Sequence, residues 1–466
     1  MSVVGELELF TRGKKVLILG FGREGQSTLA ALLSHCHPES IGIADRNEIQ
    51  VKLPSSVLVH SGSAYLEYIS AYDIIFCAPG IPIHKEAVHY FTPKQCITSQ
   101  TDIILRFCSK KTVGITGTKG KSTTSTLIYK LLESSGKTAT LVGNMGSPAF
   151  NQLEEIDSVD VILYELSSHQ LTTATKSPHI AVVLNLFPEH LDYYASKESY
   201  YAAKAEVFRH QNALDFLVVN RDDAELHKLV SSAVSNKLYF SHLQNHVAEA
   251  WFDNTNIYLR TKSINLDLKR GRFQLLGDIN VSNIMASLLV VSLVSQMNEE
   301  NIASVLECFS GLPHRIESIG TYKGIQFIND AISTTPDTTC AAIAALGSRV
   351  NTLILGGQDR PIDIDRYRSL AAQIKSKQVE NLIFIHQNGP KLKEILHVYL
   401  GELNYEVKEY FAGDMPIAVQ KSYQVTNENS ICLLSPAAPS FGAYKDYAER
   451  GAIFSKAVHK QSKNEI

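Results

Sequence analysis

The chain has 466 residues, of which 44% are hydrophobic and 20% are charged, and its formal net charge at pH 7 is -3. A chain of this length can bury more than one hydrophobic core, so we expect two or three domains. Because the charge is nearly balanced and no basic run occurs, the composition suggests neither a nucleic-acid surface nor a membrane-surface patch and favours small-molecule partners.

The seven cysteines are scattered along the chain and never form a C-x-x-C pair. An odd number of isolated cysteines argues against a disulfide framework or a zinc site and indicates a reducing compartment. The first ten residues, MSVVGELELF, lack the basic and apolar regions of a secretion signal, and no apolar run reaches membrane-spanning length. We therefore expect a cytoplasmic protein without membrane insertion.

The first motif is GFGREG at residues 20–25, which lies between an apolar run at 16–19 and a helical pattern at 26–34. A second apolar run at 41–44 ends in Asp45, twenty residues after the last glycine of the motif. This order of strand, glycine-rich turn, helix and acidic residue is typical of a Rossmann-like nucleotide site. The alternative is that the glycines only allow the helix to pack closely on the sheet.

A further apolar run at 73–77 ends in the turn APGIP at 78–82. Ligands of open α/β sheets bind at turns of this kind, which follow the carboxyl ends of strands. We expect this first Rossmann-like domain to cover residues 1–109.

The strongest motif is GITGTKGKST at residues 114–123, which follows an apolar run and opens a helical pattern at 124–135. Its glycines let backbone N–H groups turn toward one anion, the helix presents its positive end there, and Lys121 adds a full charge. Ser122 or Thr123 has the hydroxyl that holds Mg²⁺ in such loops. An ordinary turn would not need a lysine and two hydroxyls after the last glycine, so we interpret the stretch as a phosphate-binding loop.

The rest of the chain alternates apolar runs with helical patterns, which predicts mostly parallel sheets. The runs lie at 160–164, 180–185 and 215–220, and after residue 313 at 325–328, 352–355, 382–385 and 431–434. Between them, residues 238–273 have shorter strand-like pieces that fit a small antiparallel appendage. The prediction is an α/β protein of three domains, namely a Rossmann-like domain at 1–109, a central phosphate-loop domain at 110–312 and a second Rossmann-like domain at 313–466.

Polar clusters follow strand ends downstream of the phosphate loop. Glu165 comes directly after an apolar run and is suited to bind Mg²⁺, and His190 and Lys204 follow the next strand. Taken singly, these residues fit a helix-end charge, a structural histidine and a solvated lysine. Taken together they suit metal and proton chemistry. A third cluster, with Arg315 and Asp330, opens the last domain and could contact a bound nucleotide.

Six motifs in one order carry a resemblance to a known family: GITGTKGKST, ELSSHQL, NLFPEHLDYY, LPHRIE, LILGGQDR and LLSPAAPSFGAYKDYAERG. The chain resembles the Mur ligases of peptidoglycan synthesis over nearly its whole length. GFGREG and SPAAPSF are most similar to the glutamate-adding branch of that family.

The resemblance implies an ATP-dependent ligase that adds D-glutamate to UDP-N-acetylmuramoyl-L-alanine through an acyl phosphate. The three domains would bind the UDP-linked substrate, ATP and the amino acid in chain order. The implied cofactors are ATP and two Mg²⁺ ions, with Lys204 carbamylated so that it approaches the metal as an anion. The implied partners are the three small molecules, without nucleic acid, and we expect a monomer.

Position by position, the resemblance implies four groups of site residues. They are catalytic Lys121, Glu165, His190 and Lys204; ATP-binding Gly117, Thr118, Lys119, Gly120, Lys121, Ser122, Thr123, Asn280, Asn283, Arg315 and Asp330; UDP-substrate-binding Arg23, Glu24, Asp45, Arg46, Asn144, Ser167 and Gln170; and amino-acid-binding Thr334, Arg360, Ser440 and Tyr447. The implied metal ligands are Ser122, Glu165, His190 and Lys204.

Three positions depart from the family pattern. Lys119 stands where Asn is usual, Ile279 where a His precedes Asn280, and Ile332 where glutamate-adding members carry a lysine. An L-glutamate-adding relative and a non-catalytic nucleotide-binding regulatory protein therefore stay open as alternatives. A folylpolyglutamate synthase-like ligase would share the phosphate loop but is not expected to carry GFGREG.

Overall fold

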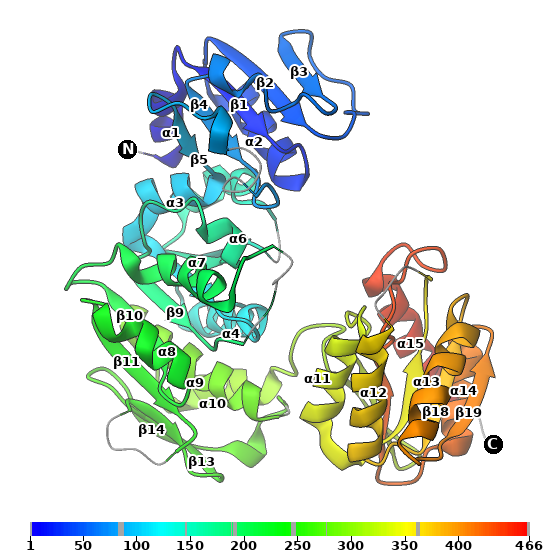
Figure 1. Ribbon diagram of the computed structural model, residues 1–466. Coiled ribbons are helices and arrows are strands. Elements are labelled where there is room, and N and C mark those ends of the chain that lie inside the picture. The colour runs from blue at the N-terminus through cyan, green and yellow to red at the C-terminus, as the bar shows by residue number, and fades with distance from the viewer. Residues whose placement is uncertain are drawn as a thin grey trace. The chain divides into compact units, whose positions relative to one another are not determined.

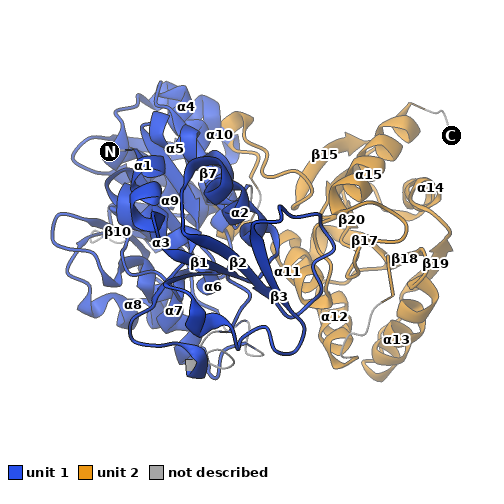
Figure 2. Cartoon of the chain, turned by 90° about the horizontal axis from the view of Figure 1, so that it is seen from above, with its two compact units in different colours: residues 1–272, 281–306 blue, residues 273–280, 307–466 orange. Residues whose placement is uncertain are grey.

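The computed structural model describes residues 2–82, 88–144, 147–187, 189, 193–243, 248–275, 277–359 and 364–463. The strands form three sheets, and the chain divides into two compact units (Figures 1 and 2). Unit 1 comprises residues 1–272 and 281–306, and unit 2 comprises residues 273–280 and 307–466. The predicted α/β class is confirmed.

The first sheet belongs to unit 1 and has the strand order β3-β2-β1-β4-β5, with every pair parallel. Its strands are β1 Lys15–Leu19, β2 Ser40–Asp45, β3 Val57–Ser61, β4 Ile74–Cys77 and β5 Cys96–Thr98, and its helices are α1 Val3–Thr11, α2 Arg23–His35 and α3 Gln100–Cys108. The strand order reverses between β1 and β4. Segments that leave the carboxyl ends of these two strands diverge, which opens a crevice there.

The second sheet has the order β14-β13-β12-β11-β10-β9-β6-β8-β7. Its strands are β6 Thr112–Thr116, β7 Ala139–Gly143, β8 Val161–Glu165, β9 Ile180–Val183, β10 Phe216–Asn220, β11 Asn236–Ser241, β12 Ala250–Phe252, β13 Asn256–Arg260 and β14 Asn265–Lys269. The helices along this stretch and after it are α4 Lys121–Ser134, α5 Leu153–Ser158, α6 Ser168–Leu171, α7 Lys197–Arg209, α8 Ala224–Leu229, α9 Asp278–Val294 and α10 Glu299–Cys308. Within this sheet, only the pairs β12–β13 and β13–β14 are antiparallel among the described strands, so the predicted appendage extends one edge of a parallel sheet.

The third sheet belongs to unit 2 and has the order β15-β16-β20-β17-β18-β19. Its strands are β15 Glu317–Tyr322, β16 Ile325–Asn329, β17 Val350–Leu355, β18 Asn381–Ile385, β19 Lys408–Ala412 and β20 Ile431–Leu434, and its helices are α11 Pro336–Leu346, α12 Asp365–Ser376, α13 Gly389–Glu402, α14 Met415–Val425 and α15 Tyr447–Ser462. The pair β15–β16 is antiparallel, and the strands from β16 to β19 run parallel.

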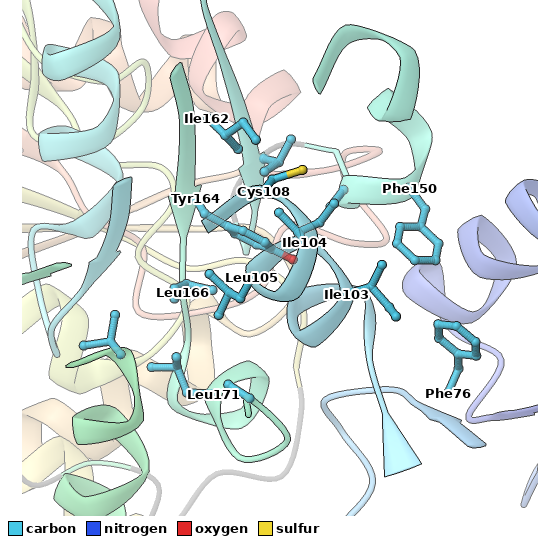
Figure 3. Close-up of a cluster of buried hydrophobic side chains, with 14 of the residues drawn as sticks. Phe76, Ile103, Ile104, Leu105, Cys108, Phe150, Ile162, Tyr164, Leu166 and Leu171 are labelled. Atoms are coloured by element: carbon cyan, nitrogen blue, oxygen red, sulfur yellow. The ribbon is translucent and has the colours of Figure 1, made fainter. Parts of the chain in front are cut away.

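Helix α3 links the cores of the first two sheets. One buried apolar cluster contains side chains of α3 and of β8, namely Ile103, Ile104, Leu105, Ile162 and Tyr164 (Figure 3). The same cluster contains Phe76 of β4, whose ring lies edge-on to Phe150 with 6.0 Å between the ring centroids. Because both sheets share this core, they belong to one compact unit, and the boundaries predicted at residues 109 and 312 stay predictions.

Within the described ranges, no helix is both long enough and apolar enough to cross a membrane. All seven cysteines are free thiols.

The third glycine of the GFGREG motif, Gly25, allows a test of how closely helix α2 packs against the glycine-rich turn. A Cβ atom added at Gly25 would lie 2.2 Å from the carbonyl oxygen of Gly20, which is backbone and cannot rotate away. We expect Gly25→Ala to lower the free energy of unfolding by about 1–3 kcal/mol.

Denaturant unfolding measures this change. Gly271→Ala is the matched control, because nothing lies within 4 Å of a Cβ at that position in the same unit, and its effect should stay within about 0.5 kcal/mol. Equal stability of the two variants would contradict the packing role of Gly25.

Candidate active site

A cavity of about 660 Å³ lies at the carboxyl end of the first sheet, in unit 1. The GFGREG turn, the segment after β2 and the turn at 78–82 line it, and segments that follow β7 and β8 complete the wall. All seven residues predicted to bind the UDP-linked substrate line this one cavity: Arg23, Glu24, Asp45, Arg46, Asn144, Ser167 and Gln170. The fold thus brings these seven residues together from four separate stretches of the chain.

Asp45 holds the glycine-rich turn in place. Its Oδ2 atom accepts a hydrogen bond of 2.7 Å from the backbone N–H of Phe21, and its Oδ1 atom accepts one of 2.8 Å from the N–H of Asn47. Gly20 has a φ of +91°, which favours glycine. Asp45 therefore orders two walls of the cavity, in addition to any contact with a ligand.

Glu24 links this cavity to the second sheet. Gln170 Nε2 donates a hydrogen bond of 2.8 Å to Glu24 Oε1. Burial raises the pKa of Glu24, and the hydrogen bond from Gln170 opposes that rise. A carboxyl group that is more readily protonated repels an anion bound in the cavity less than an ordinary carboxylate would.

A second cavity of about 420 Å³ lies beside the phosphate loop. Its lining includes Lys121, Lys204, Glu189, His169 and Tyr200. Four residues line both cavities: Pro79, Gly80, Asn144 and Ser167. The two cavities therefore form a continuous track from the glycine-rich turn to the phosphate loop.

Two lysines converge on one carbonyl group of the phosphate loop. The Nζ atoms of Lys121 and Lys204 each donate a hydrogen bond of 2.9 Å to the carbonyl oxygen of Gly117. Gly117 and Gly120 have φ angles of +148° and +89°, which explains the need for glycine at both positions. Burial lowers the pKa of Lys204 well below its ordinary value, and the charge of Lys121 adds to this shift. An anion bound here would relieve the repulsion between the two ammonium groups.

The loop is fastened to the segment that follows β9. The Thr118 hydroxyl donates to the carbonyl oxygen of Phe187 and accepts from the N–H of Phe187. The side-chain amide of Asn185 accepts from the N–H of Lys119 and donates to the Lys119 carbonyl group. Since β6 and β9 are neighbours in the sheet, these reciprocal bonds hold the loop against the adjacent strand.

Lys119 departs from the family pattern, and the structure gives it an ion pair. Its Nζ atom lies 2.5 Å from Glu189 Oε1, and Glu189 lines the second cavity. The extra lysine therefore balances the charge of a carboxylate close to Lys121 and Lys204.

Glu165 ends β8 beside the phosphate loop and is suited to a metal ion. The side chain is buried, its Oε1 atom accepts a bond of 3.2 Å from Asn144 Nδ2, and its Oε2 atom has no hydrogen-bond partner among the described residues. A buried carboxylate oxygen that accepts no hydrogen bond from the described residues is suited to bind a hard cation such as Mg²⁺. The described residues contain no cluster of three His, Cys, Asp or Glu side chains, and Mg²⁺ commonly uses one or two carboxylates together with phosphate oxygens.

The residues predicted to bind ATP fall in both units. In unit 1, Asn283 lies against the phosphate loop, because a Cβ atom at Gly120 would come within 2.3 Å of Asn283 Oδ1. Asn280, Arg315 and Asp330 belong to unit 2. His190 and Arg360, which were predicted as a metal ligand and an amino-acid ligand, lie outside the described residues.

Asp330 lies at the carboxyl end of β16 and is completely surrounded by protein. Its Oδ2 atom accepts a bond of 2.8 Å from the Ser435 hydroxyl, and burial raises its pKa to about 6. The buried guanidinium of Arg450 donates to the carbonyl oxygens of Ala331 and Ala438 at 2.8 and 2.9 Å. Arg450 thereby ties together the loops after β16 and β20.

Three residues predicted to bind the amino acid lie on the segments that Arg450 connects. Thr334 lies in the loop after β16, Ser440 lies in the segment after β20, and Tyr447 opens helix α15, which carries Arg450. Ser440 is buried, whereas Tyr447 is 38% exposed. Their shared scaffold agrees with a common site, and their roles stay predictions.

Sequence reasoning gave no role to several lining residues, including Asn47, Tyr65, His169 and Glu189. His169 and Glu189 stand inside recognised motifs, next to residues that were chosen. Asn47 and Tyr65 lie outside those motifs, and only the folded chain brings them to the cavity.

Comparison with known proteins agrees with this geometry. A family model described as the Mur ligase middle domain matches residues 115–291. The chain is similar to the UDP-N-acetylmuramoylalanine--D-glutamate ligase of Acetivibrio thermocellus, with 31% identity over 467 residues that cover 96% of this chain and 97% of that protein. The protein of the same name from Symbiobacterium thermophilum is 33% identical over 408 residues, which cover 86% and 87% of the two chains.

Solved structures share the fold. A UDP-N-acetylmuramoyl-L-alanyl-D-glutamate--2,6-diaminopimelate ligase aligns with a TM-score of 0.58 and 18% identity, covering 96% of this chain and 93% of that one. The MurF ligase of Thermotoga maritima, solved in complex with ADP, aligns with a TM-score of 0.55 and 16% identity, covering 97% of each chain.

The buried Lys204 predicts a pH-dependent stability. Because folding lowers its pKa, the unfolded chain binds more protons, so this group destabilises the fold at neutral pH and its penalty disappears as pH rises toward 10.5. We expect Lys204→Met to be more stable than the unsubstituted protein at pH 7, by on the order of 1 kcal/mol. The difference should shrink as pH rises.

Urea unfolding between pH 7 and pH 9.5, in buffer free of carbon dioxide, measures the difference. Lys137→Met is the control, since Lys137 is an exposed lysine 3.9 Å from Asp160 in the same unit, and its effect on stability should stay within about 0.5 kcal/mol. A Lys204→Met difference that stays constant would contradict the assigned penalty.

Proposed function

The chain belongs to the Mur ligase family, and we propose that it joins D-glutamate to UDP-N-acetylmuramoyl-L-alanine while cleaving ATP to ADP and phosphate. The similar proteins from Acetivibrio thermocellus and Symbiobacterium thermophilum carry the name of this reaction and match most of the chain. Their names favour the D isomer of glutamate over the L isomer. They also favour catalysis over a purely regulatory role.

The observation that carries the proposal is the continuous track in unit 1. One end has the glycine-rich turn with Arg23, Asp45 and Arg46. The other end has Lys121 and Lys204, which line the second cavity, called the reaction cavity from here on. A long substrate with a nucleotide at one end and a carboxylate at the other matches such a track. The uridine and diphosphate groups would occupy the first cavity, and the alanyl carboxylate would reach the second.

Side chains between the two ends would hold the middle of this substrate. Asn144 and Ser167 line both cavities, and Gln170 is held by Glu24. Amide and hydroxyl groups of this kind can donate to sugar and peptide oxygens. A substrate held along its whole length has its carboxylate positioned for reaction, which is the main contribution of such a site.

The phosphate loop would bind the ATP phosphates through its backbone N–H groups, Lys121, Ser122 and Thr123. Ser122, Glu165, His190 and Lys204 would hold two Mg²⁺ ions. When bound, Mg²⁺ neutralises the crowded charges of phosphates and carboxylate. Lys204 would be carbamylated, and its low pKa supports this, because an uncharged amine is the form that reacts with carbon dioxide.

The proposed reaction has two steps. A carboxylate oxygen of the alanyl group attacks the γ-phosphorus of ATP, and the bond to the ADP oxygen breaks, which leaves an acyl phosphate. The amine of glutamate then attacks the acyl carbon, and phosphate departs with the electron pair of the broken C–O bond. In the first step Lys121 and the loop N–H groups would stabilise charge on the transferring phosphoryl group.

Unit 2 would supply the amino-acid site and part of the ATP site. Thr334, Arg360, Ser440 and Tyr447 would bind glutamate, and Arg360 suits a bidentate contact with a carboxylate. Asn280, Arg315 and Asp330 would join Asn283 on the nucleotide. We further propose that residues 1–109, 110–312 and 313–466 act as three domains of a cytoplasmic monomer.

The direct test is ADP release in the presence of ATP, Mg²⁺ and UDP-N-acetylmuramoyl-L-alanine, with D-glutamate and L-glutamate supplied in separate reactions. We expect turnover with D-glutamate, and a product mass increased by one glutamate residue. Turnover with L-glutamate alone would reverse the proposed stereochemistry and assign it to the loop that contains Ile332. Absence of turnover with either isomer would overturn the proposed function.

The carbamate has a separate test. Lys204→Ala should abolish turnover, and short carboxylic acids such as acetate should restore part of it, because they can occupy the space of the missing anion. Lys121→Ala should lose activity without such rescue, because a carboxylic acid cannot replace the positive charge of the Lys121 ammonium group. Equal failure of rescue in both variants would contradict a carbamate at Lys204.

A further inference from the structure

An imidazole lines the reaction cavity and has no role in the scheme above. His169 shares this cavity of about 420 Å³ with Lys121, Glu189 and Lys204. The shared residues Asn144 and Ser167 also line this cavity, so the reacting carboxylate would enter it near His169. A neutral imidazole is a side chain that can act as a general base in catalysis.

The ring of His169 is held from several sides. It packs edge-on against Tyr193 with 4.3 Å between the ring centroids, and lies 5.5 Å from the ring of Tyr194. The Tyr193 hydroxyl donates a bond of 3.3 Å to the carbonyl oxygen of Ile81, which lines the first cavity. The next residue, Gln170, completes a capping box with Ser167 and bonds Glu24. These contacts give the imidazole a defined position.

The second step of the reaction needs a proton acceptor. Glutamate arrives as an ammonium ion, which has no lone pair, so one proton must leave before the nitrogen can attack the acyl carbon. The titratable groups that line this cavity, or contact the His169 ring, among the described residues are Lys121, Glu189, Lys204, Tyr193, Tyr194 and Tyr200.

The other groups are poorly suited to this task. Lys121 is bound to the phosphate loop, Glu189 is paired with Lys119, and Lys204 is assigned to the metal site. The tyrosines are protonated at neutral pH, because burial raises the pKa of Tyr193 to about 12 and also raises that of Tyr194 and Tyr200. Among the described titratable groups that line this cavity, His169 is the one suited to accept the proton.

We propose that His169 is the general base of the amide-forming step. Its ring nitrogen takes one proton from the α-ammonium group, and the lone pair released forms the N–C bond to the acyl carbon. The C–O bond to phosphate breaks, and the departing phosphate takes the second proton that the new amide nitrogen sheds. The inference rests on the proposed ligase function and adds the residue that activates the amine.

The two steps of the reaction allow a sharp test with His169→Phe, which keeps an aromatic ring against Tyr193. Without glutamate, the acyl phosphate formed from ATP and UDP-N-acetylmuramoyl-L-alanine is reduced with borohydride and counted as the alcohol. With D-glutamate, amide formation is followed in a single turnover. We expect acyl-phosphate formation within about twofold of the unsubstituted protein and amide formation slower by about 100-fold.

Two further readouts separate a base from a structural residue. The acid limb of the pH profile for amide formation should disappear in His169→Phe, and hydroxylamine, whose nitrogen is unprotonated at neutral pH, should react at the normal rate. His169→Gln repeats the measurement in case the larger ring disturbs the fold. His179→Phe is the control, because His179 also lies edge-on to an aromatic ring, that of Phe216, and does not line either cavity.

Each outcome has a definite meaning. Equal slowing of acyl-phosphate and amide formation would overturn the inference and make His169 a substrate-binding residue. Unchanged amide formation in both variants would also overturn it. If the unsubstituted protein forms the acyl phosphate but no amide with either glutamate isomer, the proposed amino-acid substrate is wrong. The inference about His169 is then wrong as well.

Discussion

The arrangement of the reaction cavity depends on one carbonyl oxygen, that of Gly117, which accepts hydrogen bonds from Lys121 and Lys204. Two ammonium groups on one acceptor repel each other, and the one that is buried more deeply loses its proton more readily. The same crowding favours a bound phosphate and makes Lys204 easier to deprotonate. A single contact thereby combines an anion site with an amine that is more readily deprotonated.

The position of that carbonyl group is set by the central sheet. The phosphate loop leaves β6, and the segment after the neighbouring strand β9 holds it through reciprocal bonds at Thr118 and Lys119. Glu189 lies further along the same segment and pairs with Lys119. The replacement of asparagine by lysine at position 119 therefore adds a charge where a carboxylate is available to balance it, which explains how the loop tolerates the change.

Much of the architecture could be predicted from sequence because local signals were strong. An apolar run predicted strand β20 with the observed bounds, and the glycine-rich turn and the phosphate loop lie at strand ends as expected. The strands β3 and β5 were not predicted, since they are short and only partly apolar. The Lys119–Glu189 pair and the shared lining of the two cavities could not be predicted either, because they depend on contacts between segments that are distant in the chain.

The hydrogen bond between Gln170 and Glu24 connects the glycine-rich turn of the first sheet to the helix that carries His169. Gln170 is adjacent to His169 on helix α6, and its side chain bonds Glu24 in the glycine-rich turn. A UDP-linked substrate that contacts this turn would also change the environment of the residue beside the proposed base. An acyl phosphate is labile in water, so a chain gains from orienting the base only when the substrate is fully seated. Because the two sheets share one hydrophobic core, this hydrogen bond joins a turn and a helix that are parts of one compact unit.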